Sequence, residues 1–184
     1  DGDPLPAGAV GEVWVKGDNI FKGYWRNPQK TREALKDGWF RTGDLGFAEP
    51  GDGGRIYLVG RAKELIITGG ENVYPIEVEN VLERHPDVLE AAVIGLPDED
   101  FGERVTAVVT CKKAECLPTP KEIISFCKDH LVSFKCPKEI HFVEQLPRNP
   151  LGKVEKMLLQ RTLGLKAQGP AHPPAMGLPK GIRA

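Results

Sequence analysis

GWFRTGDLGFAEPGDGGRIYLVGR, residues 38–61, predicts a β-hairpin. Two runs rich in β-branched and aromatic residues flank an Asp-Gly pair (52–53), which is typical of a two-residue type I′ turn because both positions tolerate positive φ. If this pair forms the loop, Asp44 lies directly across the hairpin from Arg61. Pro50 is compatible with a longer loop, which would shift this register by a residue or two.

The hairpin lies inside a longer β-rich segment, and a mixed pattern follows it. Short β patterns separated by turn signals occupy residues 10–17, 39–43, 45–49 and 55–60, which predicts a compact β unit. After the hairpin, apolar periodicity switches between strands and helices. We expect strands at 64–68, 88–98, 104–111 and 138–146, and helices at 75–85, 118–131 and 153–163. The sequence therefore predicts an α+β fold.

Local signals set the ends of these elements. Pro75 suits the first turn of its helix, and Thr119 with Glu122 forms a capping-box pattern. From residue 164 onward, Gly and Pro are frequent and apolar residues are few, which predicts a disordered tail over 164–184. The chain opens without Met in a turn-rich segment, and we expect it to be a piece of a longer polypeptide.

Composition excludes several classes of protein. With 184 residues and 40% hydrophobic content the chain can bury a core, and its net charge of -1 provides no global field for nucleic acid or an anionic membrane. No apolar run approaches the roughly 18 residues that span a bilayer, so we expect a soluble protein. The four cysteines lack metal-type spacing and are expected to be free thiols in a reducing compartment; they are Cys111, Cys116, Cys127 and Cys136.

Three side chains have the chemistry to hold and activate a nucleotide. Asp44, on a TGD turn, can accept hydrogen bonds from two vicinal hydroxyls, although such an Asp also simply stabilises turns. Arg61 offers a planar fork of donors for phosphate or ribose oxygens, or a surface ion pair. Lys153 follows Gly152, which permits an exposed loop, although a lysine at a helix start is also common.

Four motifs in order resemble the adenylate-forming enzymes, from about Gly11 to Gln160. They are GEVWVKGDNIFKGYWRNP at 11–28, GWFRTGDLG at 38–46, GRAKELIITGG at 60–70 and LPRNPLGK at 146–153. The resemblance implies a β-rich, barrel-like end of a large N-terminal domain over 1–60, a hinge at 61–63 and a mobile α+β lid over 64–163.

The resemblance also implies roles for individual residues. Asp44 would bind the ribose hydroxyls of ATP or AMP, and Arg61 would bind ribose and phosphate. Lys63 would be the hinge whose torsions rotate the lid between two half-reactions. Lys153 would be the adenylation lysine, a fixed cation for the charge that builds on the α-phosphate.

In the TGGENVYP segment, residues 68–75, the resemblance assigns a second set of contacts. Gly69 and Gly70 would line the channel for the pantetheine arm of coenzyme A, and Asn72 would contact the nucleotide. The alternative is a structural turn, because the segment lacks the GxxxxGK[ST] pattern of phosphate loops. Some relatives carry a further lysine where this chain has Ile67, so that role is not transferred.

By this resemblance, the parent protein is an acyl-CoA synthetase that joins a carboxylic acid to coenzyme A with ATP, and Mg²⁺ accompanies the ATP on ligands outside this chain. The phosphate-binding loop and acyl pocket are absent here, so the missing N-terminal domain is an expected partner and the isolated chain should be inactive. The alternatives are a non-catalytic interaction module and an adenylation domain of another subclass. The expected compartment is the cytoplasm or the mitochondrial matrix.

Overall fold

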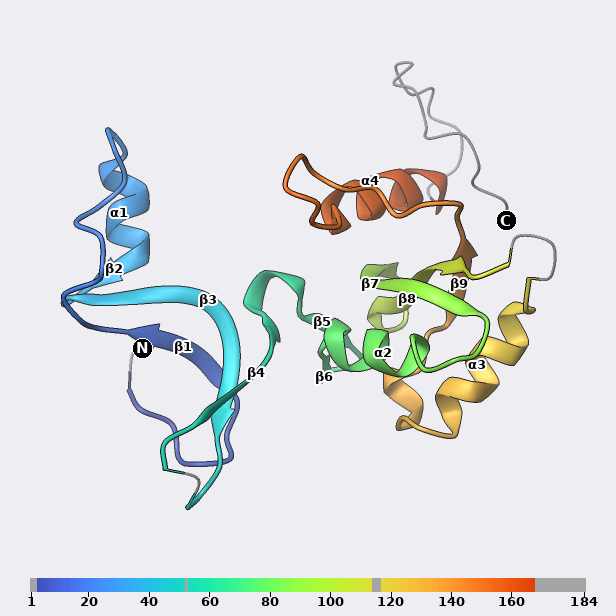
Figure 1. The fold of residues 1–184 in the computed structure, drawn as a ribbon, viewed down its shortest axis with the longest axis horizontal. Helices are drawn as coiled ribbons and strands as arrows, with labels where there is room; N and C mark the ends of the chain where they lie inside the picture. Colours follow the sequence, from blue (N-terminus) through green and yellow to red (C-terminus); the bar gives the residue numbers. More distant parts are fainter. Residues whose placement is uncertain (1–2, 52, 114–116, 168–184) are drawn as a thin grey trace. The chain divides into compact units, whose positions relative to one another are not determined.

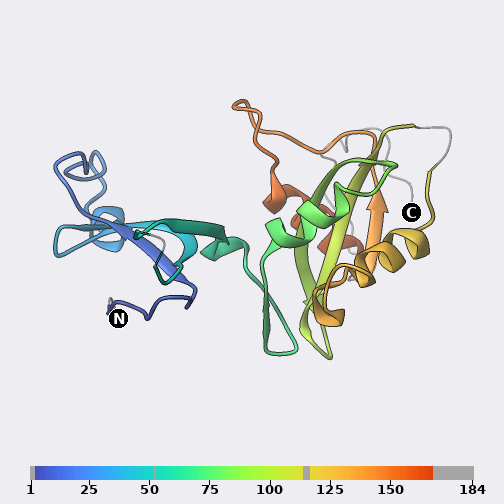
Figure 2. The same cartoon turned by 60° about the horizontal axis from the view of Figure 1, so that its bottom comes forward.

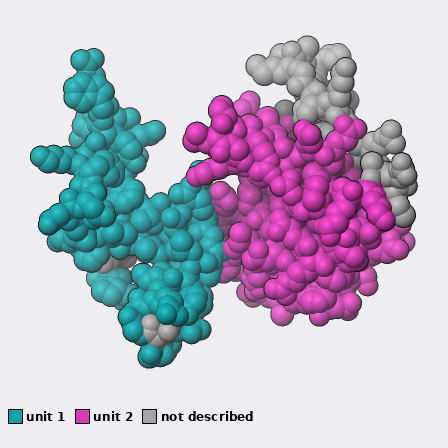
Figure 3. All heavy atoms as spheres, viewed as in Figure 1, with its two compact units in different colours: residues 1–63 teal, residues 64–184 magenta. Residues whose placement is uncertain are grey.

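A computed structural model describes residues 3–51, 53–113 and 117–167 of the chain. These residues form two compact units, the first ending at Lys63 and the second beginning at Glu64 (Figures 1 and 3). None of the helices in these ranges is long and apolar enough to cross a membrane. The expected hinge at 61–63 ends at the same residue as the first unit.

The first unit is an antiparallel sheet built around one long strand. Its elements in chain order are β1 (Gly11–Val15), α1 (Pro28–Ala34), β2 (Leu35–Lys36), β3 (Trp39–Ala48), β4 (Ile56–Arg61) and a 3₁₀ turn, η1 (Ala62–Glu64), which crosses the boundary between the units. Strand β3 pairs with all three other strands, and Figure 1 shows its strong curvature. The two strands expected at 39–43 and 45–49 are therefore one.

The register of the β3–β4 hairpin confirms the predicted pairing of Asp44 with Arg61. The pairing shifts by one residue between Leu45 and Gly46, where Val59 of β4 is skipped, so the strands meet the loop in a different register. The connection runs from residue 49 to 55, longer than two residues, as Pro50 allows. Asp52, part of the predicted turn, lies outside the described residues.

The first unit has almost no interior. Among its described residues only Gly46 is buried, and the buried apolar side chains begin at Ile66, in the second unit. Large apolar side chains are instead exposed on this sheet and its loops, including Trp25 at 87% and Leu58 at 64%. A sheet normally needs a second layer over one face to be stable, and the described residues of this unit provide none.

The second unit is a mixed sheet with helices on both faces (Figures 1 and 2). Its elements are β5 (Ile66–Thr68), β6 (Glu71–Val73), α2 (Pro75–Leu82), β7 (Val88–Asp98), β8 (Gly102–Cys111), α3 (Pro120–Lys128), η2 (Ser133–Lys135), β9 (Glu139–Phe142) and α4 (Lys156–Ala167). All pairs are antiparallel except β8–β9, which is parallel. The predicted α+β fold is confirmed.

Two cores lie on opposite faces of this sheet. Helices α2 and α3 cover the face that carries Val93 and Ala107, while α4 covers the face that carries Ile94 and Val108. The middle parts of strands β7 and β8 are consequently buried on both sides. The apolar run AAVIGL in β7 and the alternation of Val and Ala with Thr in β8 match this burial.

Some elements and boundaries differ from those expected: α1, β2 and β6 were not predicted, β9 is shorter than the expected strand at 138–146, and α4 begins at Lys156, not at 153. Helix α1 has Asn27 as its N-cap, accepting from the Lys30 N–H at 3.0 Å, with Pro28 in its first turn, a signal that could have found it. Strand β6 was read as loop because it has only three residues. Helix α4 includes residues 164–167, which were assigned to the disordered tail, and the rest of that tail lies outside the described part of the chain.

Candidate functional site

Asp44 and Arg61 meet across the β3–β4 hairpin. Arg61 Nε donates to Asp44 Oδ1 at 2.8 Å, and the two side chains are 45% and 35% exposed, respectively. The contact uses one of the five N–H donors of the guanidinium, and a carboxylate has about four acceptor sites. The pair therefore keeps acceptors and donors side by side at the surface, a combination that suits a ligand with hydroxyls next to a phosphate.

Asp44 lies within strand β3, where residues 42–44 make a bulged turn opposite Val13 of β1, and this turn is held by hydrogen bonds to β1. Thr42 Oγ1 donates to the Val13 carbonyl at 2.7 Å and accepts from the Asp44 N–H at 3.0 Å. The next residue, Gly43, has φ of +74°, which favours glycine, and its N–H donates to Glu12 Oε1 at 3.2 Å. The direction of the Asp44 carboxylate is thus set by its neighbours before any ligand arrives.

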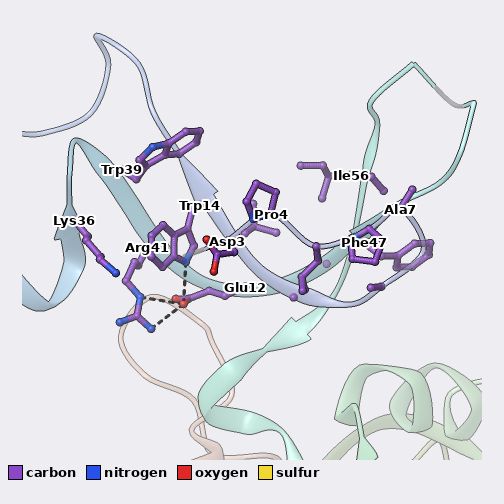
Figure 4. Close-up of a pocket in the computed structure, with 17 residues that line it drawn as sticks. Asp3, Pro4, Ala7, Glu12, Trp14, Lys36, Trp39, Arg41, Phe47 and Ile56 are labelled. Carbon is purple, nitrogen blue, oxygen red and sulfur yellow. Dashed lines mark hydrogen bonds and ion pairs between the residues drawn. The ribbon is translucent and has the colours of Figure 1, made fainter. Parts of the chain in front are cut away.

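Glu12 links this turn to the rest of the sheet (Figure 4). Its Oε2 accepts from Arg41 Nη2 at 2.8 Å and Nε at 3.0 Å, and from Trp14 Nε1 at 3.1 Å. Desolvation acts to raise the pKa of Glu12, but the hydrogen bonds from Arg41 and Trp14, the charge of Arg41 and the Gly43 N–H together hold this pKa below its ordinary value. Glu12 is therefore a charged structural support beneath the turn.

Lys63 and the Gly-rich segment lie further along the chain. Lys63 is exposed, at the middle of η1. Gly69 and Gly70 form the two-residue loop of the β5–β6 hairpin, with φ of +59° and +83°, which is the type I′ geometry. Asn72 is exposed on β6, opposite Ile67 and two residues after Gly70. The structure thus places both glycines and Asn72 on one short hairpin.

Lys153 is exposed near the end of a tight turn that precedes α4, a segment that projects from the layered unit in Figure 2. Gly152 has φ of +81° and donates its N–H to the Asn149 carbonyl at 2.8 Å. Within the described ranges, Lys153 Nζ has no recorded hydrogen bond or ion pair. Its ammonium group is therefore available to a ligand rather than committed to its own unit.

Some residues around this turn were not found from the sequence. Arg148 Nη1 donates to the Gly152 carbonyl at 2.7 Å, and the same guanidinium forms an ion pair with Glu90 of β7. Asn149 could have been recognised as a turn former, because it precedes Pro-Leu-Gly. Glu90 could not, because it lies 58 residues from Arg148.

The candidate residues are distributed over both units. Asp44 and Arg61 belong to the first unit, while Lys153 and the glycine hairpin belong to the second. In the part of the chain that the structure describes, no group of three or more His, Cys, Asp or Glu side chains is arranged to hold a metal ion.

Comparison with known proteins identifies the second unit. Residues 77–153 match the family model described as AMP-binding enzyme C-terminal domain. The chain is 44% identical over 159 residues to the putative acyl-CoA ligase YdaB of Bacillus subtilis, covering 86% of this chain and 31% of YdaB. It is 47% identical over 150 residues to the long-chain-fatty-acid-CoA ligase FadD13 of Mycobacterium tuberculosis, covering 82% of this chain and 29% of FadD13. The chain therefore spans about a third of the length of these relatives.

Solved structures of related proteins also match this chain over most of its length. ATP-bound MatB from Rhodopseudomonas palustris matches with a TM-score of 0.81 at 46% identity, covering 87% of this chain and 31% of MatB. The apo structure of MatB matches with a TM-score of 0.62 at the same identity, covering 87% and 32%.

Proposed function

Because this chain belongs to the AMP-binding, adenylate-forming enzymes and contains their C-terminal domain, we propose that it is the C-terminal part of an acyl-CoA synthetase. The observation that carries the proposal is the exposed Lys153 ammonium on its glycine turn, in a chain that also presents Asp44 beside Arg61. The parent enzyme would activate a carboxylic acid with ATP and transfer the acyl group to coenzyme A.

In the first half-reaction, a carboxylate oxygen of the acid attacks the α-phosphorus of ATP. The bond from this phosphorus to the bridging oxygen of the β-phosphate breaks, and pyrophosphate leaves with the electron pair. Two anions approach each other in this step, and a fixed Lys153 ammonium would lower the barrier by offsetting the negative charge on the phosphoryl oxygens. One such preorganised group contributes a factor of about 10² to 10³ in rate.

Asp44 and Arg61 would hold the nucleotide during this attack. The carboxylate accepts hydrogen bonds from the two ribose hydroxyls, and the guanidinium donors not used in the contact with Asp44 face ribose and phosphate oxygens. Mg²⁺ would enter with ATP on ligands outside this chain, where it neutralises phosphate charge. Among the described residues, no group of three or more His, Cys, Asp or Glu side chains is arranged to hold it.

In the second half-reaction, the thiol of coenzyme A attacks the acyl carbon of the adenylate. The carbon–oxygen bond to AMP breaks, AMP leaves, and the thiol gives up its proton. Gly69 and Gly70 would let the pantetheine arm pass close to the backbone, because neither residue has a side chain to obstruct it. Asn72, on the same hairpin, would contact the nucleotide.

Lys63 would be the hinge between the two half-reactions. Support comes from the place of Lys63, the last residue before the second unit. A rotation there would exchange the Lys153 turn for the glycine hairpin at the nucleotide.

The rest of the polypeptide would cover the first unit. The exposed apolar side chains of that unit and its lack of a buried core indicate a large protein partner, and the relatives are about three times as long as this chain. The triphosphate loop and the acyl pocket would lie in that partner. The isolated chain should therefore release no AMP above blank when given ATP, coenzyme A and fatty or short-chain acids.

The decisive experiment is Lys153→Ala in the full-length enzyme. Acyl-adenylate formation, followed by ATP–pyrophosphate exchange, should fall by about 10² to 10³. Thioester formation from supplied acyl-adenylate should continue, because that step needs no attack on phosphorus. Unchanged exchange would remove Lys153 from the mechanism and would favour the alternative of a non-catalytic module.

A further inference from the structure

The turn that carries Lys153 is tied to the sheet by Arg148. One terminal nitrogen of its guanidinium, Nη1, donates to the Gly152 carbonyl at 2.7 Å, and the other, Nη2, forms an ion pair with Glu90 Oε1 on β7. The carbonyl that it holds belongs to the peptide bond leading into Lys153. A single planar group thus connects the backbone next to the ammonium-bearing residue with a strand of the central sheet.

Asn149 fixes the same turn from inside. Its Oδ1 accepts the N–H groups of Leu151 and Lys153, both at 3.0 Å, and its own N–H donates to the Lys153 carbonyl at 2.9 Å. Below the turn, the Glu155 N–H donates to the Pro147 carbonyl at 2.8 Å. The backbone N–H and C=O of Lys153 are therefore both occupied, while its side chain remains exposed.

No apolar packing holds the tip of this turn. Leu151 at the tip is 83% exposed and residues 150–153 are all exposed, whereas the stem packs against the core beneath α4 through Leu146 and Val154. The Arg148 and Glu90 side chains are each 41% exposed, and an ion pair of that kind contributes little to the stability of a fold. The contacts of Arg148 are therefore too weak to account for the stability of the unit but well placed to restrict one backbone segment.

We propose that Arg148 is a positioning residue for acyl-adenylate formation: it anchors the Lys153 turn to Glu90 so that the ammonium reaches the α-phosphate in one fixed geometry. The proposal rests on the proposed function of Lys153. A displacement of about 1 Å in a catalytic group can reduce a rate by about 10²-fold, so a turn whose tip has no apolar packing needs such an anchor. Lysine could not replace Arg148 fully, because a single ammonium lacks the planar fork that reaches a carboxylate and a carbonyl in two directions.

The test uses Arg148→Ala in the full-length enzyme and measures the two half-reactions separately. We expect kcat for acyl-adenylate formation to fall by about 10- to 100-fold, with KM for ATP and for the acid within about twofold of wild type. Thioester formation from supplied acyl-adenylate should be unchanged, which also shows that the variant is folded. Arg148→Lys should recover part of the lost rate. An equal loss in both half-reactions would mean a general structural role and would overturn the proposal.

Arg104→Ala is the matched control. Arg104 also joins a glutamate to a backbone carbonyl in this unit, donating to Glu139 Oε2 at 3.0 Å and to the Pro97 carbonyl at 3.1 Å. These partners belong to the ends of β7 and β9, not to the Lys153 turn. The control should adenylate at the wild-type rate. A loss as large as that of Arg148→Ala would show that removing any such arginine has this effect, and it would overturn the proposal.

A double-mutant cycle distinguishes this proposal from the function on which it rests. If Arg148 acts through Lys153, then Arg148→Ala should cost nothing further in a Lys153→Ala background. An equal cost in both backgrounds would show that Arg148 acts independently and would overturn the positioning role. Unchanged adenylation in Lys153→Ala alone would refute the proposed function instead. A normal rate in Arg148→Ala with a defective Lys153→Ala would refute only the further inference.

Discussion

Replacing Glu79 by alanine should destabilise the second unit by about 3 to 4 kcal/mol. Glu79 is 9% exposed, and its Oε1 accepts the Val93 N–H at 2.8 Å and the Lys156 ammonium at 2.6 Å. Alanine leaves the fully buried Val93 N–H without an acceptor, which costs about 1–3 kcal/mol. It also removes one partner of a largely buried charge. That loss is smaller than the full 3–5 kcal/mol of a broken buried pair, because Lys156 keeps Glu64 at 3.2 Å.

Glutamine at position 79 separates the two contributions. Its side-chain oxygen can still accept the Val93 N–H, so only the charged attraction to Lys156 is lost. We therefore expect Glu79→Gln to cost about 1–2 kcal/mol, roughly half the effect of alanine.

The assay is urea unfolding of the 184-residue chain, followed by far-UV circular dichroism. The helices of the second unit dominate that signal, whereas all three tryptophans, Trp14, Trp25 and Trp39, lie in the first unit and their fluorescence does not report on Glu79. With a slope of about 2 kcal/mol per molar urea, a loss of 3 to 4 kcal/mol moves the midpoint down by about 1.5 to 2 M.

Two results would refute this reasoning. The first is a cost of less than about 1 kcal/mol for Glu79→Ala, since an orphaned buried N–H alone should exceed it. The second comes from the cycle of Glu79→Gln with Lys156→Met: the double variant should cost less than the sum of the single variants, because neither member of the 79–156 pair is then left charged without the other. Strict additivity would mean that the two side chains are not coupled.

Three further predictions concern other parts of the chain. Gly164→Ala should stabilise the second unit by about 0.5–1 kcal/mol in the same urea assay, because glycine weakens a helix and the added methyl group would meet no described atom outside its own helix segment within 4 Å. A loss of stability in this variant would contradict the prediction. The pKa of Glu12 is lowered, so the stabilising charge of Glu12 is present above the ordinary pKa of 4.5 and is lost as pH falls below that value. An acid titration followed by tryptophan fluorescence should therefore show a transition that Glu12→Gln removes. Persistence of the transition in this variant would implicate another carboxylate. Burial raises the pKa of Cys127 to about 12, so the thiol should stay unmodified when the folded chain is treated with iodoacetamide at pH 8. Peptide mass spectrometry measures the modification. Rapid labelling of Cys127 would show that this core opens.

Short-range chemistry made much of the fold predictable. The Thr119–Glu122 capping box forms as expected, with Thr119 Oγ1 accepting the Glu122 N–H and Glu122 accepting the Thr119 N–H. The pairing of Asp44 with Arg61 also matches the prediction, although the connection is longer than two residues and the pairs nearest to it are offset by one residue. These features depend on residues that are neighbours in sequence or are joined by one turn.

Other features became visible only with the tertiary structure. The one-residue shift at Val59 changes the register beyond the pairs next to Asp44, and no local signal marks it. Helix α1 and strand β6 were missed because seven and three residues give little periodicity.

The sequence by itself determined the α+β fold, the position of Asp44 opposite Arg61 and a glycine turn that exposes Lys153, because each follows from backbone preferences over a few residues. Only the tertiary structure decided what holds that turn. Arg148 and Glu90 are 58 residues apart and meet because the segment before α4 passes beside β7, an edge strand of the folded sheet. A contact of that kind depends on the assembled layers, whereas turn and cap preferences act before the layers form.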